Sequence, residues 1–399
     1  MAIEVQYVLG DYSSLIFSER HKIFDDQVLN FLSDLSIVLR KSSEIRNYPD
    51  VANFAFWCRR ANLQRISSKY PTDERRVGVG KVFHVTPSNV PINFAFSWAL
   101  SLLAGNSNIV RLSSKNFEEV NLVIKCIREV LSEEVHRPIQ QNNVFIRYEH
   151  NEDISKWFMS QIDARVIWGS DRTIFEFKNM NTKLNCRDLF FSTRNSIALI
   201  DESRLASLNS EEFSRVVRLF VRDSLTYFQL GCSSPRAVHW LDSTKKKYGV
   251  RREFWKEVGN LVQTESLIEP AHAMQRFNNL CSLIARKSSD IKSVNRDFDG
   301  IYLIESESLS DVDVEERIVF GTFLEFLQVD LESLIKGVSG KVQTICYFGV
   351  DKEELFKVLA QDSTNKVDRI VPFGSAFEIS STWDGFDIIR GLSRTIEVI

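Results

Sequence analysis

The stretch VGVGKVFHVTPSNVPINFAFSWALSLLAGNSNIVRL, residues 77–112, predicts the fold of this chain. Residues 77–85 have the apolar composition of a buried strand, and Pro91 can begin a helix that ends at Gly105. A second apolar strand is expected at 108–112. A strand, a helix and another strand in this order indicate one repeat of a parallel sheet.

The same alternation continues along the chain. Further strands are expected at 144–148, 164–168, 196–200 and 237–240, and further helices at 117–131, at 152–161, from about 173, and at 211–228. These segments predict an α/β protein with doubly wound parallel sheets. Ligands of such sheets bind at the carboxyl ends of the strands, so residues that follow a strand are candidates for a binding site.

The composition is that of a soluble globular protein. The chain has 399 residues, of which 44% are apolar and 26% charged, and this length suits two or three domains. A net charge of −3 gives no general attraction to nucleic acid or to an anionic membrane. The amino terminus lacks the pattern of a signal peptide, and the longest apolar stretch, 90–104, is too short and too polar to cross a bilayer.

The cysteines are spread widely along the chain. There are six, and no two of them form a CxxC pair, which argues against a zinc site and against a disulfide framework. We therefore expect no metal. Reduced thiols favour a reducing compartment, and the expected location is the cytoplasm.

Cys232 is the first candidate for chemistry. It follows the helix expected at 211–228, and the small or turn-forming residues Gly231, Ser233, Ser234 and Pro235 surround it. Such neighbours leave a sulfur accessible and bring backbone N–H groups near it, which favours a nucleophile and an oxyanion site. The alternative is a cysteine that only packs in the core.

Three further features follow the expected strands. Asn89, in the pentapeptide 87–91, is either a fixed amide donor or a turn and helix-cap residue, and the two roles can coexist. Arg111 is either a surface charge or a contact for a nucleotide ribose or phosphate. Gly169 and Ser170 form a turn before a helix, where a pyrophosphate can bind, although one glycine alone is a weak signal.

In their order and spacing, these features resemble the aldehyde dehydrogenase superfamily, and within it the LuxC-type acyl-CoA reductases, or fatty-acid reductases. The resemblance covers roughly residues 75–399. The phrases that carry it are HVTPSNVPINFAFSWALSLLAGNSNIVRLSSKN (84–116), DARVIWGSDRTI (163–174), CSSPRAV (232–238) and WDGFD (383–387).

The resemblance implies a doubly wound, Rossmann-type cofactor domain and an α/β catalytic domain. The expected boundaries are an N-terminal helical or oligomerisation segment at 1–75, a dinucleotide-binding domain at 76–205, a catalytic domain at 206–370 and a C-terminal segment at 371–399. Members of the superfamily commonly form dimers or tetramers, so a homo-oligomer is expected.

The resemblance also implies roles for single residues. Cys232 corresponds to the family nucleophile, and Asn89 to the amide of the oxyanion hole. Gly169 and Ser170 correspond to the pyrophosphate turn. Arg111 falls where many aldehyde dehydrogenases have a lysine that meets the adenosine ribose. An arginine there can also pair with a 2′-phosphate, which favours NADPH and leaves NADH as the alternative.

One departure from the family pattern bears on the reaction. Hydrolytic aldehyde dehydrogenases have a water-activating glutamate in a Glu-Leu-Gly-Gly segment, and the matching residues here, 188–193, read DLFFST. Asp188 is the only acid close by. Such a site suits the NADPH-dependent reduction of an acyl thioester to an aldehyde through an S-acyl cysteine. The favoured thioester is a fatty acyl-CoA.

Two alternatives to an acyl-CoA reductase remain open. One is a non-CoA aldehyde or semialdehyde dehydrogenase. The other is a catalytically silent subunit that assembles with an acyl-activating partner protein. No general acid or base is evident. His84 and Asp188 are the nearest candidates, and a structural role is the favoured interpretation of His84.

Overall fold

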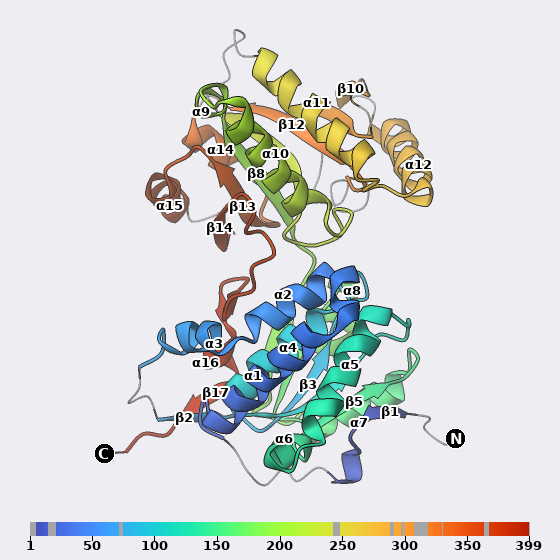
Figure 1. Ribbon diagram of the computed structural model, residues 1–399, viewed down its shortest axis with the longest axis vertical. Coiled ribbons are helices and arrows are strands. Elements are labelled where there is room, and N and C mark those ends of the chain that lie inside the picture. The colour runs from blue at the N-terminus through green and yellow to red at the C-terminus, as the bar shows by residue number, and fades with distance from the viewer. Residues whose placement is uncertain are drawn as a thin grey trace. The chain divides into compact units, whose positions relative to one another are not determined.

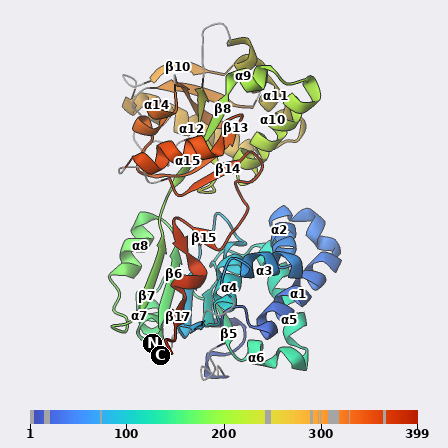
Figure 2. The same ribbon diagram turned by 90° about the vertical axis from the view of Figure 1, so that its left-hand side faces the viewer.

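The computed structural model of the chain divides into two compact units (Figures 1 and 2). The first is formed by 1–192 and 379–399, and the second by 193–378. The structure describes residues 5–14, 21–71, 75–241, 248–287, 291–296, 298, 300–306, 318–328, 330–362 and 367–398.

The first unit is built on one largely parallel sheet. Its described strands lie in the order β1-β5-β4-β3-β6-β7, and only β1 is antiparallel to its neighbour. In the register, Val85 lies opposite both Arg111 and Ile167, so the carboxyl ends of three central strands meet at one edge. The strands are β1 Gln6–Leu9, β3 Lys81–Val85, β4 Ser107–Arg111, β5 Asn143–Arg147, β6 Ala164–Trp168 and β7 Arg187–Phe191.

Helices cover both faces of this sheet because successive strand side chains point to opposite faces. On one face, Phe83 packs with Phe158 of α7 in an apolar cluster. On the other face, His84 contacts Ser97 of α4. Figure 2 shows α7 and α8 on one side of the strands and α1 and α5 on the other. The helices are α1 Asp26–Lys41, α2 Pro49–Trp57, α3 Arg60–Ser67, α4 Asn93–Leu103, α5 Glu118–Leu131, α6 Arg137–Gln140, α7 Glu152–Gln161 and α8 Asp171–Lys178.

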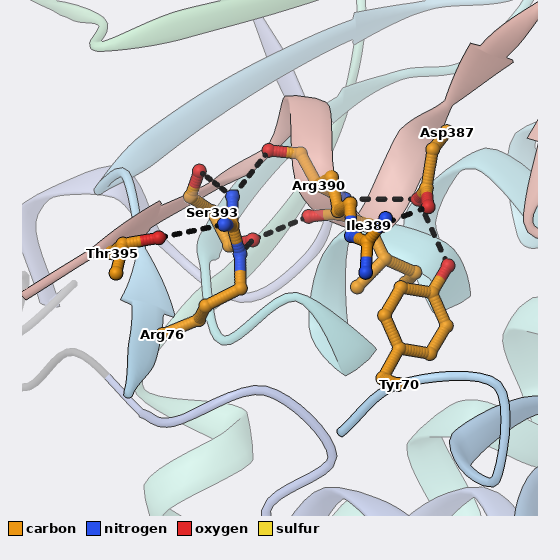
Figure 3. Close-up of polar contacts among 7 residues, drawn as sticks. All are labelled: Tyr70, Arg76, Asp387, Ile389, Arg390, Ser393 and Thr395. Atoms are coloured by element: carbon orange, nitrogen blue, oxygen red, sulfur yellow. Dashed lines mark hydrogen bonds and ion pairs between the residues drawn. The ribbon is translucent and has the colours of Figure 1, made fainter. Parts of the chain in front are cut away.

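The C-terminal segment returns to the first unit and pairs with its early residues (Figure 3). Strand β17 (Ser393–Thr395) is antiparallel to β2 (Arg76–Gly78). The Arg76 guanidinium donates to the hydroxyls of Ser393, at 2.9 Å, and Thr395, at 2.7 Å. The Tyr70 hydroxyl lies 2.8 Å from the Asp387 carboxylate. The remaining elements of this segment are β15 Thr382–Trp383, β16 Phe386–Asp387 and α16 Ile388–Gly391.

The second unit has its own mostly parallel sheet, with the described strands in the order β10-β11-β12-β9-β8-β13-β14. Only β10 pairs antiparallel. The strands are β8 Asn195–Asp201, β9 Pro235–Leu241, β10 Ile291–Asn295, β11 Tyr302–Ser306, β12 Thr322–Gln328, β13 Val342–Phe348 and β14 Arg369–Pro372.

Two apolar clusters fill the faces of the second sheet. Ala198 and Ile200 of β8 belong to one cluster with Phe220 of α10, and Ile197 and Leu199 belong to the other, with residues of α12. This alternation is the period of two that a strand between two helical layers requires. The helices are α9 Glu202–Ala206, α10 Ser210–Leu225, α11 Tyr248–Thr264, α12 Pro270–Lys287, α14 Leu331–Gly337 and α15 Lys352–Gln361.

The prediction of an α/β protein with doubly wound parallel sheets is confirmed. Some details differ. The helix expected at 211–228 ends at Leu225, because Phe228 has a left-handed backbone with φ of 54°. The compact units divide after Ser192, where the expected boundary was 205, because β8 pairs with β9 and β13 in the second sheet. None of the described helices is long and apolar enough to cross a membrane.

Candidate active site

A pocket of about 370 Å³ opens at the carboxyl ends of β3, β4 and β6 in the first unit. Asn89, Arg111, Gly169 and Ser170 all line it. Four candidates that are far apart in the sequence are therefore neighbours at one edge of one sheet, the place where open parallel sheets bind ligands. The other lining residues are Val85, Thr86, Pro87, Ser88, Leu112, Ser113, Ser114, Trp168 and Thr173.

Asn89 lies in the turn between β3 and α4 and is exposed. The helix itself begins at Asn93, and its N-cap residue is Ile92, which makes no side-chain cap bond. Asn89 is therefore a turn residue, and the helix-cap interpretation is wrong. Asn89 is one of the residues that line the pocket.

Gly169 and Ser170 form the turn between β6 and α8. A Cβ on Gly169 would lie 2.9 Å from Cγ2 of Thr173, which is too close for any other residue without a shift. The Ser170 hydroxyl caps α8 by accepting the N–H of Thr173 at 3.2 Å. Gly169 and Ser170 thus line the pocket at the N-terminus of a helix, the arrangement that suits a phosphate.

Arg111 ends β4, and its guanidinium lies over the ring of Tyr148, 4.4 Å from the centroid. It also donates to the Tyr148 carbonyl at 3.4 Å, while its buried Nε has no hydrogen-bond partner. Ser113 and Ser114 follow in the same pocket, and none of the described residues that line it is acidic. A cation beside two hydroxyls, with no carboxylate, fits an anionic group of a ligand.

Cys232 lies in the second unit, on the turn between α10 and β9. Phe228 and Gln229, which precede Cys232 in this turn, have positive φ angles of 54° and 63°. The fully buried amide of Gln229 holds this conformation: Oε1 accepts the N–H of Gly321 at 2.7 Å, and Nε2 donates to the Thr322 carbonyl at 2.9 Å. Strain at non-glycine residues persists only where surrounding contacts enforce it.

The Cys232 side chain is partly exposed, as a nucleophile requires. Cys58, Cys126 and Cys346 are buried, and burial raises the pKa of each of these thiols. Of the other two, Cys186 is partly exposed and Cys281 is exposed on α12.

Neither candidate for a general acid or base is available for that role. His84 is fully buried between Ser97 and Asn108, at 2.9 and 3.0 Å, and burial lowers its pKa to about 4. Asp188 lies on β7 and forms a two-pronged ion pair with Arg165, at 2.7 and 3.0 Å. No cluster of metal-ligating side chains occurs among the described residues.

Two residues beside the candidates carry no sequence signal of their own. The Ser196 hydroxyl donates to the Cys232 carbonyl at 2.7 Å, and Trp168 lines the pocket next to Gly169 while its Nε1 donates to Ser97. Both lie in apolar strand patterns, where a serine or a tryptophan is ordinary.

The fold is that of the aldehyde dehydrogenases, as comparison with solved structures shows. An oxidoreductase from Marinobacter aquaeolei is 11% identical and superposes with a TM-score of 0.65, over 98% of this chain and 89% of that one. Lactaldehyde dehydrogenase from Escherichia coli is 11% identical, with a TM-score of 0.62 over 93% and 85% of the two chains. A mutant of Thermus thermophilus 1-pyrroline-5-carboxylate dehydrogenase is 12% identical, with a TM-score of 0.62 over 92% of this chain and 80% of that one.

The family is defined by sequence. The profile of the acyl-CoA reductases (LuxC) matches residues 19–395, and the chain belongs to this family. No curated protein sequence matches the chain. Family membership together with the fold supports an aldehyde-forming oxidoreductase.

Proposed function

We propose that this protein reduces an acyl thioester to an aldehyde, with NADPH as reductant and an S-acyl Cys232 intermediate. The favoured substrate is a fatty acyl-CoA. The observation that carries the proposal is the pocket in which Asn89, Arg111, Gly169 and Ser170 come together, in a chain of the acyl-CoA reductase family. The accessible cysteine on a strained, locked turn supports the covalent step.

The pocket suits a nicotinamide dinucleotide. The turn of Gly169 and Ser170, at the N-terminus of α8, would receive the pyrophosphate. Arg111, with an unpartnered Nε and the hydroxyls of Ser113 and Ser114 nearby, would pair with the 2′-phosphate, so we favour NADPH over NADH. When bound, the cofactor supplies a hydride to the acyl carbon.

The chain's own residues would act on the acyl group as follows. The Cys232 thiolate attacks the thioester carbonyl, a C–S bond forms, and the coenzyme A thiolate leaves as the original C–S bond breaks. The backbone N–H of Cys232 donates to the oxyanion that develops, both in acylation and in reduction, and the resemblance to the family assigns the second donor to Asn89. After reduction, Cys232 leaves as a thiolate and the aldehyde is released. Removal of one such donor raises a barrier by about 2.7–4 kcal/mol.

The environment of Asp188 argues against hydrolysis as the main fate of the acyl-enzyme. A carboxylate that activates water must accept its proton, and both oxygens of Asp188 already accept hydrogen bonds from Nε and Nη2 of Arg165. No other acid occurs in the segment 188–193. An acyl-enzyme without such a base persists long enough to be reduced.

The decisive experiment is the intact mass of the protein after incubation with a mixture of acyl-CoAs in the absence of nicotinamide. We expect one added acyl group, mapped by peptide analysis to Cys232, with a preferred chain length. Cys232→Ala should take up none, and Cys281→Ala, which removes the exposed cysteine of α12, should behave as wild type.

Other outcomes would favour the alternative functions. Absence of an adduct, combined with oxidation of aldehydes without coenzyme A, would point to a non-CoA aldehyde dehydrogenase. Absence of both an adduct and cofactor binding would point to a silent subunit. Acylation only in the presence of an acyl-activating partner protein would change the donor and leave the role of Cys232 intact.

A further inference from the structure

The segment that follows β14 packs against the turn that carries Cys232. A Cβ on Gly231 would lie 3.1 Å from the ring of Phe377. The same ring meets Tyr227 edge-on, with the centroids 4.8 Å apart. Phe377 thus packs directly beside the residue that precedes the candidate nucleophile, within the second unit.

One arginine organises this segment. Arg369, the first residue of β14, donates through Nη1 to the carbonyl of Ala376 at 2.6 Å and through Nη2 to the carbonyls of Ser375, at 3.1 Å, and Glu378, at 2.5 Å. These bonds attach the guanidinium to the carbonyls on both sides of Phe377, the residue whose ring packs next to Gly231. The cation is therefore tied to the segment that packs against the Cys232 turn.

The opposite side of the segment is held by an acid. The Asp223 carboxylate accepts the N–H groups of Gly374, at 2.6 Å, and Ala376, at 3.2 Å. Burial raises the pKa of Asp223 to about 6, while these bonds and the charges of Arg222 and Arg369 oppose the rise. Asp223 and Arg369 together satisfy the donors and acceptors of the same short loop.

The sheet register independently places Arg369 two strands away from Ser196, the residue that bonds to Cys232. Arg369 pairs with Thr344 of β13, and Thr344 pairs with Ser196 of β8. Neighbouring strands are about 4.8 Å apart, so the backbones of Arg369 and Ser196 are separated by roughly 10 Å across the sheet. The Ser196 hydroxyl in turn bonds the Cys232 carbonyl at 2.7 Å.

The charges around Arg369 include the thiol groups. Burial lowers the pKa of Arg369, and interactions with Cys346, Cys232, Glu378 and Asp223 oppose this shift. An attraction that favours the charged form of the arginine favours the charged thiolate form of the cysteine equally. Arg369 also lowers the pKa of Cys346, but burial outweighs this effect and keeps that pKa well above the usual value. Cys232 is partly exposed, so its thiolate does not carry the same burial cost.

We propose that Arg369 stabilises the thiolate form of Cys232, so that it is a positioning and activating residue of the candidate active site. The proton lost by the thiol passes to solvent. The inference rests on the proposed function only in that Cys232 is taken as the nucleophile. Its test measures the thiol itself and needs no turnover.

The test is the rate of alkylation of Cys232 by iodoacetamide across pH 5 to 10, followed by mass analysis of the Cys232 peptide in the full-length protein. In wild type, we expect the half-maximal rate at a pH below the ~8.5 of an ordinary thiol. Arg369→Met should raise this midpoint by about one pH unit or more, and Arg369→Lys should restore part of the shift. Arg194→Met, which removes a neighbouring arginine paired with Asp368 at 3.2 Å, is the matched control and should leave the midpoint unchanged.

A folded Arg369→Met protein with the wild-type midpoint would overturn the inference. If that variant does not fold, the comparison moves to wild type: at pH 6, Cys232 must be alkylated faster than the exposed Cys281, and equal or slower alkylation would overturn the inference as well. Retention of reductase activity in Cys232→Ala would instead contradict the proposed function and leave the effect of Arg369 standing.

Discussion

The hydroxyl of Ser196 donates a 2.7 Å hydrogen bond to the backbone carbonyl of Cys232. Ser196 is fully buried near the start of β8, so the bond ties the turn that carries the candidate nucleophile to the central part of the second sheet. With the buried amide of Gln229, this contact fixes the turn from two sides. A rigid turn of this kind keeps a nucleophile in one orientation.

Replacement of Ser196 by alanine should loosen this turn. The loss of a buried hydrogen bond costs about 1 kcal/mol of stability, and somewhat more if the Cys232 carbonyl stays unsatisfied. We expect a lower urea midpoint and a reduced kcat with little change in KM. Ser207→Ala, which removes a local bond on the exposed surface of the same unit, is the control. An unchanged kcat in a destabilised S196A protein would show that the bond serves stability alone.

Gly169→Ala should weaken cofactor binding. The added methyl group would meet Thr173 at 2.9 Å and displace the cap that Ser170 makes to α8. A rise in the Kd for the nicotinamide cofactor of about tenfold corresponds to ~1.4 kcal/mol. Cys232 should still be acylated, because it belongs to the other unit.

The matched control for this substitution is Gly249→Ala. Gly249 lies on α11, and a Cβ there would meet nothing within 4 Å. Alanine in a helix is more favourable than glycine by roughly 0.5–1 kcal/mol, so this variant should be as stable as wild type or more stable. Equal cofactor affinity in G169A and G249A would contradict the assignment of the pyrophosphate turn.

Arg111 should determine the preference for NADPH. A charge-assisted hydrogen bond contributes about 1.5–3 kcal/mol, so Arg111→Met should raise KM for NADPH roughly 10- to 100-fold and KM for NADH far less. The ratio of kcat/KM for the two cofactors is the measurement. Lys115→Met, which removes an exposed charge four residues further on, should leave that ratio unchanged. A uniform loss with both cofactors would place Arg111 away from the 2′-phosphate.

Much of the first sheet could be predicted from the sequence because its elements are marked locally. In residues 77–112, short apolar runs bounded by Pro91 and Gly105 predict α4 and β4 to within a few residues. The single strand expected at 77–85 is two strands, β2 and β3, and β2 pairs with β17 outside the main sheet. Strand β7 was missed, because it begins with the charged Arg187 and Asp188 and lies at the edge of the sheet. The pocket followed from the rule that ligands bind at carboxyl ends of strands.

The surroundings of Cys232 could not be predicted, because they depend on residues distant in the chain. The apolar period of α10 continues to Phe228, yet the backbone there is left-handed, since Gln229 bonds to residues 321 and 322. Arg369 lies near the turn only because β14 pairs with β13 and β13 pairs with β8. The sequence predicts the nucleophile at this position, and the groups that hold it emerge only from the fold.

His84 should make stability depend on pH through burial. Its pKa is about 4 in the folded protein and ~6.5 when unfolded, so the unfolded state binds the proton first as the pH falls. Stability is therefore present above pH ~6.5 and falls as the pH drops toward 4, by about 3 kcal/mol from this group. The measurement is the unfolding free energy of wild type and His84→Gln between pH 4 and 7. An identical slope in both proteins would contradict a buried neutral imidazole.

The roles of Cys232 and Asn89 can be separated by two variants. Cys232→Ala should take up no acyl group and show no turnover, because no thiolate is left to attack the thioester. Asn89→Ala should still be acylated, but with kcat lower by roughly 10²–10³, because one donor to the oxyanion is lost. Single-turnover measurement of acylation, by release of coenzyme A, and of aldehyde formation tests both steps.

The control for Asn89 is Ser88→Ala, which alters the adjacent residue of the same turn and the same pocket lining without removing an amide. It should keep kcat within about threefold of wild type, since no donor to the oxyanion is lost. A drop equal to that of N89A would mean that the turn conformation matters and the amide does not. Full acylation of Cys232→Ala would move the nucleophile to another residue, with the exposed Cys281 as the first to test.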